Sequence, residues 1–226
     1  MRALLLLLVG CGEPGPFLLA DVVVDAPGAT DDRFGDPELA VNGVRGGGDV
    51  AGSLDVYALG AEGAAATLVL GFSDLPAPDQ PGPDLAVFEN PFLAPTTGAF
   101  MDLVVVSVRA EDGDWVTFPH DYLAEDETRY DNDPALWSGF AGRTPVQLHE
   151  EDNAVDPFSV EAGGDVFDLS DLPDTPEADD IRTFGFVEVR LESAISRVNP
   201  DTGAPYVMDP ISNGADIDGV YAWRSP

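Results

Sequence analysis

The stretch that decides the fold is LVVVSVRAEDGDWVTF, residues 103–118. Two β-prone runs, 103–108 and 115–118, are joined through Glu111-Asp112-Gly113-Asp114. Asp-Gly is favoured in tight hairpin turns because these residues tolerate a positive φ. We therefore expect an antiparallel β-hairpin at this point of the chain.

Short β-prone runs recur on both sides of this hairpin, at 22–24, 54–59, 66–72, 85–88, 145–148, 181–191 and 217–223. Glycine, proline and aspartate separate the runs, and helical periodicity is almost absent. The pattern predicts an all-β chain, folded as a single-domain, jelly-roll-like β-sandwich with long loops. A barrel is the weaker alternative.

Three segments between these strands have their own expected structure. We expect 54–59 and 66–72 to form a second hairpin through the turn residues 60–63. We expect 119–142 to be a long surface loop. The acidic, proline-interrupted segment 170–180 is expected to be a loop with at most one turn of helix.

Residue 11 is the only cysteine, and it follows an apolar and small-residue run at 4–10 behind the basic Arg2. The segment Leu8-Val9-Gly10-Cys11 resembles a bacterial lipoprotein cleavage box, in which the precursor is cut before a cysteine that then carries lipid. An ordinary signal peptide with a leftover thiol is the alternative. The resemblance makes the membrane a partner through Cys11.

This interpretation divides the chain into three parts. They are a lipoprotein signal peptide at 1–10, the lipidated cysteine and a short tether at 11–20, and a β-sandwich domain at 21–226. We expect the protein in the cell envelope, as an outer-membrane lipoprotein or at the cell surface.

The composition is strongly acidic, with 42 Asp and Glu residues against ten basic residues and a formal net charge of −32. All ten basic residues are arginine. Because such a chain repels phosphate, the charge argues against nucleic acid as a partner. General solubility or adaptation to salt is the alternative explanation of the acidity. A single cysteine excludes disulfides within the chain and Cys-ligated zinc or iron–sulfur sites.

A second resemblance rests on GPDLAVFEN, residues 82–90. The segment is similar to a family of bacterial secreted and cell-surface proteins that carry a Gly-Pro-Asp-x-x-Val-Phe-Glu-Asn signature, mostly of unassigned function. Further pieces match in the same order, at 52–56, 106–108, 141–142, 145–146, 162–169 (AGGDVFDL) and 216–220 (DIDGV). The resemblance implies a secreted β-rich module and supplies no activity.

Carboxylate and amide side chains stand at the predicted strand ends, beside small or glycine neighbours. Calcium takes about six to eight oxygen ligands from carboxylates, amides and backbone carbonyls. Because a jelly roll can bring the ends of its early and closing strands together, we expect one structural calcium ion. Its expected ligands are Asp84, Glu89, Asn90, Asp165, Asp168, Asp216 and Asp218. The alternative is that each of these side chains caps a turn or bonds a loop backbone.

The aromatic residues of 119–142 lie among acids, and exposed rings beside polar groups are surfaces on which sugars stack. Tyr122, Tyr130 and Trp137 are therefore the candidate ligand-binding residues. The alternative is that these rings cover an edge of the core.

Two main function hypotheses follow, and a purely structural envelope component that binds no small ligand is a third, weaker alternative. The first is a lipid-anchored, non-enzymatic envelope module with a structural calcium site and loops that bind an extracellular glycan or protein. The second is a secreted polysaccharide hydrolase that uses two carboxylates as acid and base, drawn from Asp84, Glu89, Asp165, Asp168 and Asp218. Only two histidines exist, and the chain has neither a Gly-x-Ser-x-Gly elbow nor a His-Glu-x-x-His motif, so no catalytic residue is assigned.

Overall fold

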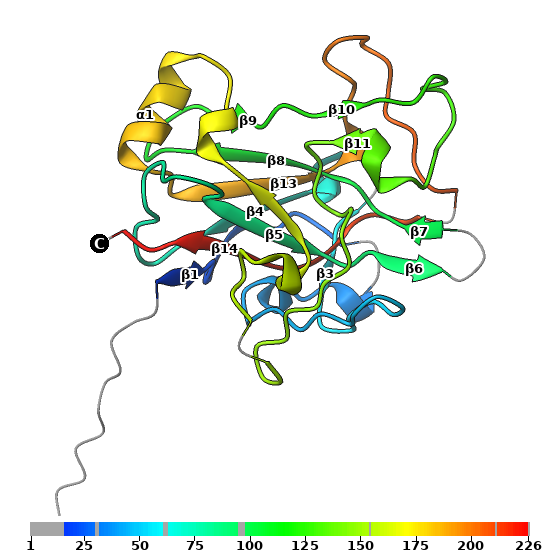
Figure 1. Cartoon of the computed structure of the whole chain (residues 1–226), viewed down its shortest axis with the longest axis horizontal. Helices are drawn as coiled ribbons and strands as arrows, with labels where there is room; N and C mark the ends of the chain where they lie inside the picture. Colours follow the sequence, from blue (N-terminus) through cyan, green and yellow to red (C-terminus); the bar gives the residue numbers. More distant parts are fainter. Residues whose placement is uncertain are drawn as a thin grey trace, which may run out of the picture.

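The computed structural model describes residues 16–29, 32–60, 63–94, 98–153, 155–210 and 212–225. Within these ranges the chain forms two five-stranded antiparallel sheets (Figure 1). Cys11 and the segment 1–10 lie outside the described residues, so the signal peptide and the lipidation site stay predictions.

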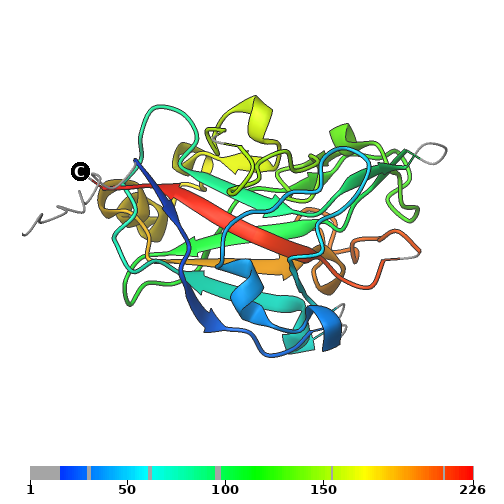
Figure 2. The same cartoon turned by 90° about the horizontal axis from the view of Figure 1, so that it is seen from below.

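The first sheet has the order β1 (Phe17–Leu19), β14 (Asp216–Trp223), β5 (Leu85–Glu89) and β12 (Asp165–Phe167), with β3 (Tyr57–Ala58) also paired to β14. The second has the order β2 (Val22–Asp25), β4 (Thr67–Gly71), β13 (Glu188–Ser193), β8 (Val104–Arg109) and β9 (Val116–Thr117). Strands that follow each other in the chain often lie in different sheets, as β1 and β2 do (Figure 2). The first and last strands are neighbours, which is the arrangement of a jelly roll. The predicted all-β sandwich is confirmed.

The core lies between the two sheets because each contributes one apolar face. Val189 and Leu191 of β13 are fully buried, whereas the residues that alternate with them, Glu188, Arg190 and Glu192, are partly exposed. This alternation is the period of two expected for a strand with one face on the core. The same apolar cluster includes Val87 of β5 and Val106 of β8, so one core joins the sheets. Full burial of each such side chain stabilises the fold by ~1.5–3 kcal/mol.

The predicted hairpin at 103–118 is confirmed. Ser107 of β8 pairs with Thr117 of β9, and their hydroxyl oxygens lie 2.9 Å apart. The turn places Asp112 at a φ of +58°, a conformation that aspartate tolerates, and the amide of Gly113 donates to the carbonyl of Ala110.

The predicted hairpin at 54–59 and 66–72 is wrong. Tyr57 pairs with Ile217 in the first sheet, whereas Leu68 pairs with Leu191 in the second. The two runs therefore belong to different sheets and do not pair with each other. The run 145–148 also forms no strand. The carbonyls of Val146 and Leu148 accept hydrogen bonds from the amides of Gly48 and Gly46, both at 2.9 Å, but the pairing stays local.

The expected loop at 170–180 contains the start of a helix, α1 (Pro176–Phe184). Thr175 caps it by accepting a hydrogen bond from the amide of Ala178, and Pro176 occupies the first helical position, where a missing N–H costs nothing. Gly185 ends the helix at a φ of +86°. A proline of the segment expected to be a loop thus begins a helix. The predicted strand at 181–191 is wrong at its start, because 181–184 belong to α1; the observed strand, β13, runs from Glu188 to Ser193.

Two small hairpins and seven short 3₁₀ helices complete the described part. The hairpins are β6 (Phe92–Ala94) with β7 (Gly98–Phe100), and β10 (Asp121–Tyr122) with β11 (Trp137–Ser138). The 3₁₀ helices are Asp32–Phe34, Pro37–Ala40, Gly63–Ala66, Pro134–Leu136, Val160–Ala162, Leu169–Asp171 and Ala194–Ser196.

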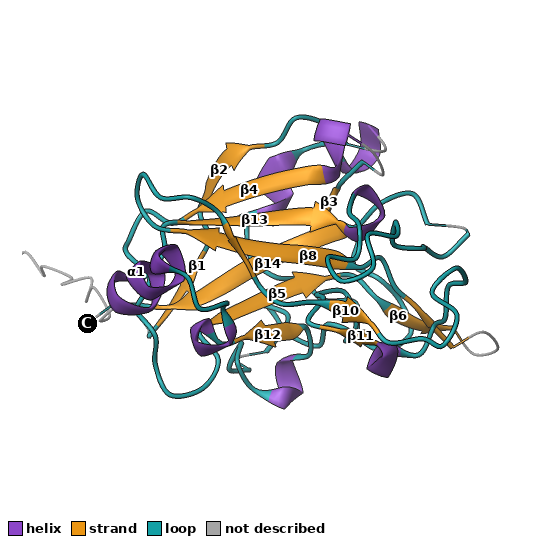
Figure 3. Ribbon diagram, turned by 90° about the horizontal axis from the view of Figure 1, so that it is seen from above, coloured by secondary structure: helices purple, strands orange, loops and turns teal. Residues whose placement is uncertain are grey.

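The sandwich has two distinct ends (Figure 3). One end carries α1, and we call it the α1 end. The other carries β6, β10 and β11, and we call it the loop end. Phe17 pairs with Trp223 at the close of β14, so the chain enters the sandwich at the α1 end. Because Phe17 to Leu19 form β1, the domain begins before residue 21. These three residues, predicted to be part of the tether at 11–20, therefore belong to the first sheet.

Candidate functional site

The seven predicted metal ligands do not meet at one point. Asp84 precedes β5 and Glu89 is its last residue, so the two carboxylates lie at opposite ends of the same strand. Five steps along a strand span ~17 Å, far more than one ion can bridge. The prediction of a single calcium ion shared by all seven residues is therefore wrong.

The first group of acids lies at the α1 end. Asp79, Asp84 and Asp168 each offer a carboxylate oxygen, and these oxygens lie within 4.8 Å of one another. We call this group the α1-end cluster. Three converging carboxylates could hold a metal ion. Asp79 comes from the proline-rich loop before β5, and the sequence had not singled it out.

Asp84 is the buried member of the α1-end cluster, with 2% of its surface exposed. Its two oxygens accept bonds from the backbone amides of Gln80, at 2.9 Å, and Leu169, at 2.8 Å. The pKa of Asp84 is raised to about 6, mainly by burial; the two amides oppose this rise, and the neighbouring Asp79 and Asp168 contribute to it. Burial and Asp168 also raise the pKa of Asp79.

The second group lies at the loop end, and we call it the loop-end cluster. It consists of Glu89 from β5, Asp102 from the segment before β8, and Asp216 from the start of β14. The backbone amide of Asp216 donates to Glu89 Oε1 at 3.0 Å. Burial first, and then the Asp102 and Asp216 carboxylates, raise the pKa of Glu89 well above its usual value. Burial raises the pKa of Asp102 to about 7 and that of Asp216 to about 6.

Asn90 positions the loop-end cluster instead of lying at a shared calcium site. Its Oδ1 accepts from the amide of Ser53, and its Nδ2 donates to the carbonyl of Ser53 at 3.1 Å. The Asn90 side chain also hydrogen-bonds Asp216. Gly142 packs against the other side of the cluster. Segments that carry the resemblance at 52–56, 82–90, 141–142 and 216–220 thus come together here.

The two remaining predicted ligands lie outside both clusters. Asp165 accepts from the amide of Arg143 at 2.8 Å and pairs with its guanidinium at 3.1 Å. Asp218 is fully buried, and its Oδ1 accepts from the amide of Arg45 at 2.9 Å.

Two of the three aromatic residues predicted to bind a ligand are buried. Trp137 has no exposed surface, Tyr122 is 2% exposed, and their rings stack with centroids 3.8 Å apart. The indole Nε1 donates to the carbonyl of Asp131 at 2.9 Å. Trp137 and Tyr122 therefore belong to a second apolar cluster under the 119–142 segment, and the prediction that they bind a ligand is wrong. Tyr130 is only partly buried.

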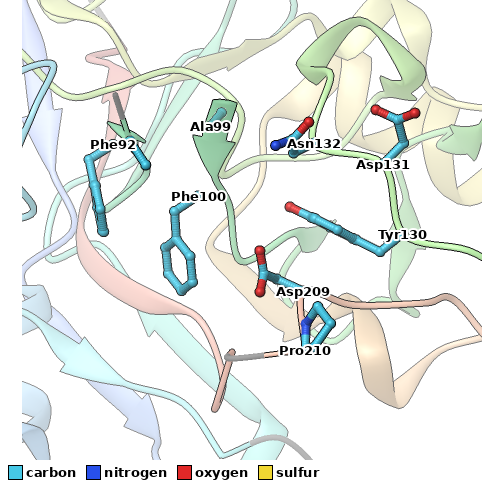
Figure 4. Close-up of a pocket in the computed structure, with 9 residues that line it drawn as sticks. Phe92, Ala99, Phe100, Tyr130, Asp131, Asn132, Asp209 and Pro210 are labelled. Atoms are coloured by element: carbon cyan, nitrogen blue, oxygen red, sulfur yellow. The ribbon is translucent and has the colours of Figure 1, made fainter. Parts of the chain in front are cut away.

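Tyr130 lines a pocket of about 500 Å³ at the loop end (Figure 4). The rings of Phe92 and Phe100 stack at 5.1 Å on another wall. In Figure 4 the carboxylate of Asp209 lies between the rings of Phe100 and Tyr130. The complete lining is Phe92, Ala94, Ala99, Phe100, Tyr130, Asp131, Asn132, Asp209 and Pro210.

Besides Asp79, sequence reasoning missed Asp102 and Asp209. Asp102 directly precedes a predicted strand, so the rule that selected the other strand-end acids applies to it as well. Asp209 stands in a segment with no strand or helix pattern, Tyr206 to Pro210, and nothing in its neighbours indicates a pocket.

Comparison with known proteins gives no match, whether with protein-family models, curated proteins or solved structures. The resemblance to the secreted and cell-surface family stays a prediction. Over the described part of the chain, no helix has the length and apolar character needed to cross a membrane.

Proposed function

We propose that this protein is a lipid-anchored module of the cell envelope that binds an extracellular glycan in the loop-end pocket, with calcium at the α1-end cluster as a structural ion. The anchor is Cys11, and the proposed location is the outer membrane or the cell surface. Catalysis is not part of this proposal.

The observation that supports the proposal best is that the pocket and β1, the first strand of the sandwich, lie at opposite ends of the domain. Cys11 precedes Phe17 by six positions. Phe17 enters at the α1 end, whereas the pocket lies at the loop end. A lipid on Cys11 would hold the α1 end against the membrane and leave the pocket facing away from it, which is the orientation that an envelope receptor requires.

The lining of the pocket has the chemistry of a sugar site. Phe92, Phe100 and Tyr130 offer apolar ring faces, and Asp131, Asn132 and Asp209 offer hydrogen-bonding groups beside them. Sugars present apolar C–H faces ringed by hydroxyls, and a site with both kinds of group matches them. The concentration of acids disfavours anionic glycans, so neutral or amino sugars fit best.

The calcium ion would stabilise the α1 end modestly. Extracellular calcium modules bind with dissociation constants of ~10⁻⁴ to 10⁻³ M. With ~1 mM free calcium and the tighter of these values, occupancy adds about 1.4 kcal/mol to the free energy of unfolding. The three carboxylates of the α1-end cluster also repel one another less when an ion lies between them.

A pair of matched phenylalanine variants tests the pocket. Phe100→Ala is expected to weaken binding to a glycan identified on an array of immobilised polysaccharides by about tenfold, because one stacking ring is lost. Phe184→Ala removes a ring that is 68% exposed on α1, at the opposite end, and is expected to leave binding unchanged. Equal binding by the parent and both variants would contradict a site in this pocket.

The hydrolase alternative has one observation in its favour: Glu89 and Asp102 have raised pKa values, and Asp102 lies two positions after the pocket residue Phe100. Glu89 is only 2% exposed, however, so a polysaccharide reaches it poorly. Turnover of a polysaccharide panel decides between the two functions. We expect no release of reducing ends, whereas release that is lost in a folded Glu89→Gln variant would favour the hydrolase.

A further inference from the structure

We propose that Glu89, Asp102 and Asp216 bind a second divalent cation of the calcium type at the loop end, and that this ion fixes the segment behind the pocket. This inference goes beyond the proposed function, because it concerns metal binding alone and does not depend on which ligand enters the pocket.

The first observation is an oxygen of Glu89 without a partner. Glu89 is 2% exposed, and its Oε1 accepts from the amide of Asp216. Its Oε2 is buried and makes no hydrogen bond with any described residue. Leaving a buried carboxylate oxygen unpaired is costly, and a bound cation removes that cost.

Further oxygens surround the same place. Gly142 lies directly beside the unpaired oxygen of Glu89. A Cβ added to Gly142 would be 3.1 Å from Glu89 Oε2 and 2.5 Å from the carbonyl oxygen of Asp102. The carboxylate of Asp102 is 8% exposed, and that of Asp216 comes from the neighbouring strand. The donors are therefore all oxygens, which suits calcium better than zinc or copper.

No ion pair within the described part of the chain balances these acids. Among the ion pairs between described residues, none includes Glu89, Asp102 or Asp216. Burial disfavours the ionised form of all three, and repulsion from neighbouring carboxylates adds to this effect at Glu89 and Asp102. The carboxylate oxygens of Glu89, Asp102 and Asp216 do not all lie within 4.8 Å of one another, as those of the α1-end cluster do. At least one of the three acids would therefore contact an ion through water, which completes the coordination shell in many calcium sites.

The site connects to the pocket through neighbouring residues. Phe100 lines the pocket, and Met101 follows it directly before Asp102. The carbonyl of Met101 accepts a hydrogen bond from the hydroxyl of Tyr130, another lining residue, at 3.4 Å. An ion on Asp102 would therefore hold both the Phe100 and the Tyr130 sides of the pocket.

Thermal unfolding of the purified full chain, stripped with EDTA and titrated with CaCl₂, tests the proposal. The Asp79→Asn/Asp168→Asn double variant disables the α1-end cluster. At a calcium concentration 100-fold above Kd, we expect its Tm to rise by about 5–10 °C. Adding Glu89→Gln, which removes the charge with little change of shape, is expected to abolish this rise.

Asp102→Asn in the same double variant is a second test, which holds if Glu89→Gln does not fold. It too is expected to abolish the rise. A calcium-dependent rise that survives both substitutions would overturn the proposal. So would a double variant whose Tm calcium leaves unchanged.

Discussion

Replacing Trp137 with alanine is expected to lower the free energy of unfolding by about 3–5 kcal/mol, because it empties a large volume in a packed cluster. The indole has no exposed surface, and it contacts the rings of Tyr122, Phe140 and Tyr206 at centroid distances of 3.8, 5.5 and 6.4 Å. The corresponding fall in Tm is about 6–20 °C, measured by circular dichroism.

Trp115→Ala is the matched control. Trp115 is partly exposed, and the guanidinium carbons of Arg109 and Arg190 lie 4.6 and 4.7 Å from its ring centre. Loss of such cation–π contacts at the surface costs about 1 kcal/mol, so its Tm is expected to fall much less. If Trp137→Ala instead kept the parent's Tm and lost only glycan binding, Trp137 would be a ligand contact and the packing described above would be incorrect.

The burial of Trp137 illustrates what the sequence could not reveal. Asp131 and Asp133 are exposed, and their density around the aromatic residues suggested a solvated loop. The strands beneath, β10 and β11, have only two residues each, which is too short to display an alternating pattern. Where each side chain points was decided by packing against distant residues such as Tyr206.

The strand pattern itself was readable wherever local chemistry determined it. The turn at Asp112-Gly113 fixed the β8–β9 hairpin, and the alternation at Glu188 to Ser193 matches β13. The partner of each strand was not readable in the same way, since Tyr57 and Leu68 are close in sequence and pair in different sheets. Sheet membership depends on contacts between distant segments.

The sequence identified buried acids at strand ends correctly, but the prediction that they share one metal site is wrong. Asp84, Glu89, Asp165 and Asp218 are all buried acids at or near strand ends, as the sequence suggested. Asp84 and Glu89, however, bracket one run of β-prone residues, and the length of that run already separates them. The approach of Glu89 to Asp216 depends on the register of the sheet, in which Glu89 pairs with Ile217, so it could not be predicted from the sequence.

Asp218→Asn is expected to stabilise the protein at pH 8 and to have much less effect at pH 5. Asp218 is fully buried, and its Oδ2 has no hydrogen-bond partner among the described residues. Burial raises its pKa from 3.8 to about 7, with Asp55 adding to the rise and Arg45 opposing it. Between these values the folded protein binds more protons than the unfolded chain, so stability falls as the pH rises through about 4 to 7.

The quantity that tests this prediction is the change in the free energy of unfolding between pH 5 and pH 8, compared between the parent and the variant. Because the pKa rises from 3.8 to about 7 on folding, the parent loses about 2–3 kcal/mol of stability between pH 5 and pH 8 through this group. The asparagine side chain of the variant is neutral at both pH values, and its Oδ1 can still accept from the amide of Arg45. Any fixed cost of burying the amide cancels when the two measurements are subtracted.

Denaturant unfolding in EDTA at both pH values measures this difference without interference from bound metal. Asp180→Asn, an exposed position on α1, is the control and is expected to show no comparable dependence. If Asp218→Asn changed stability equally at pH 5 and pH 8, Asp218 would have to be paired or solvated in the folded protein. Because EDTA removes bound metal, the contact of its Oδ2 would then be with water or with a protein group, and the burial described above would be incorrect.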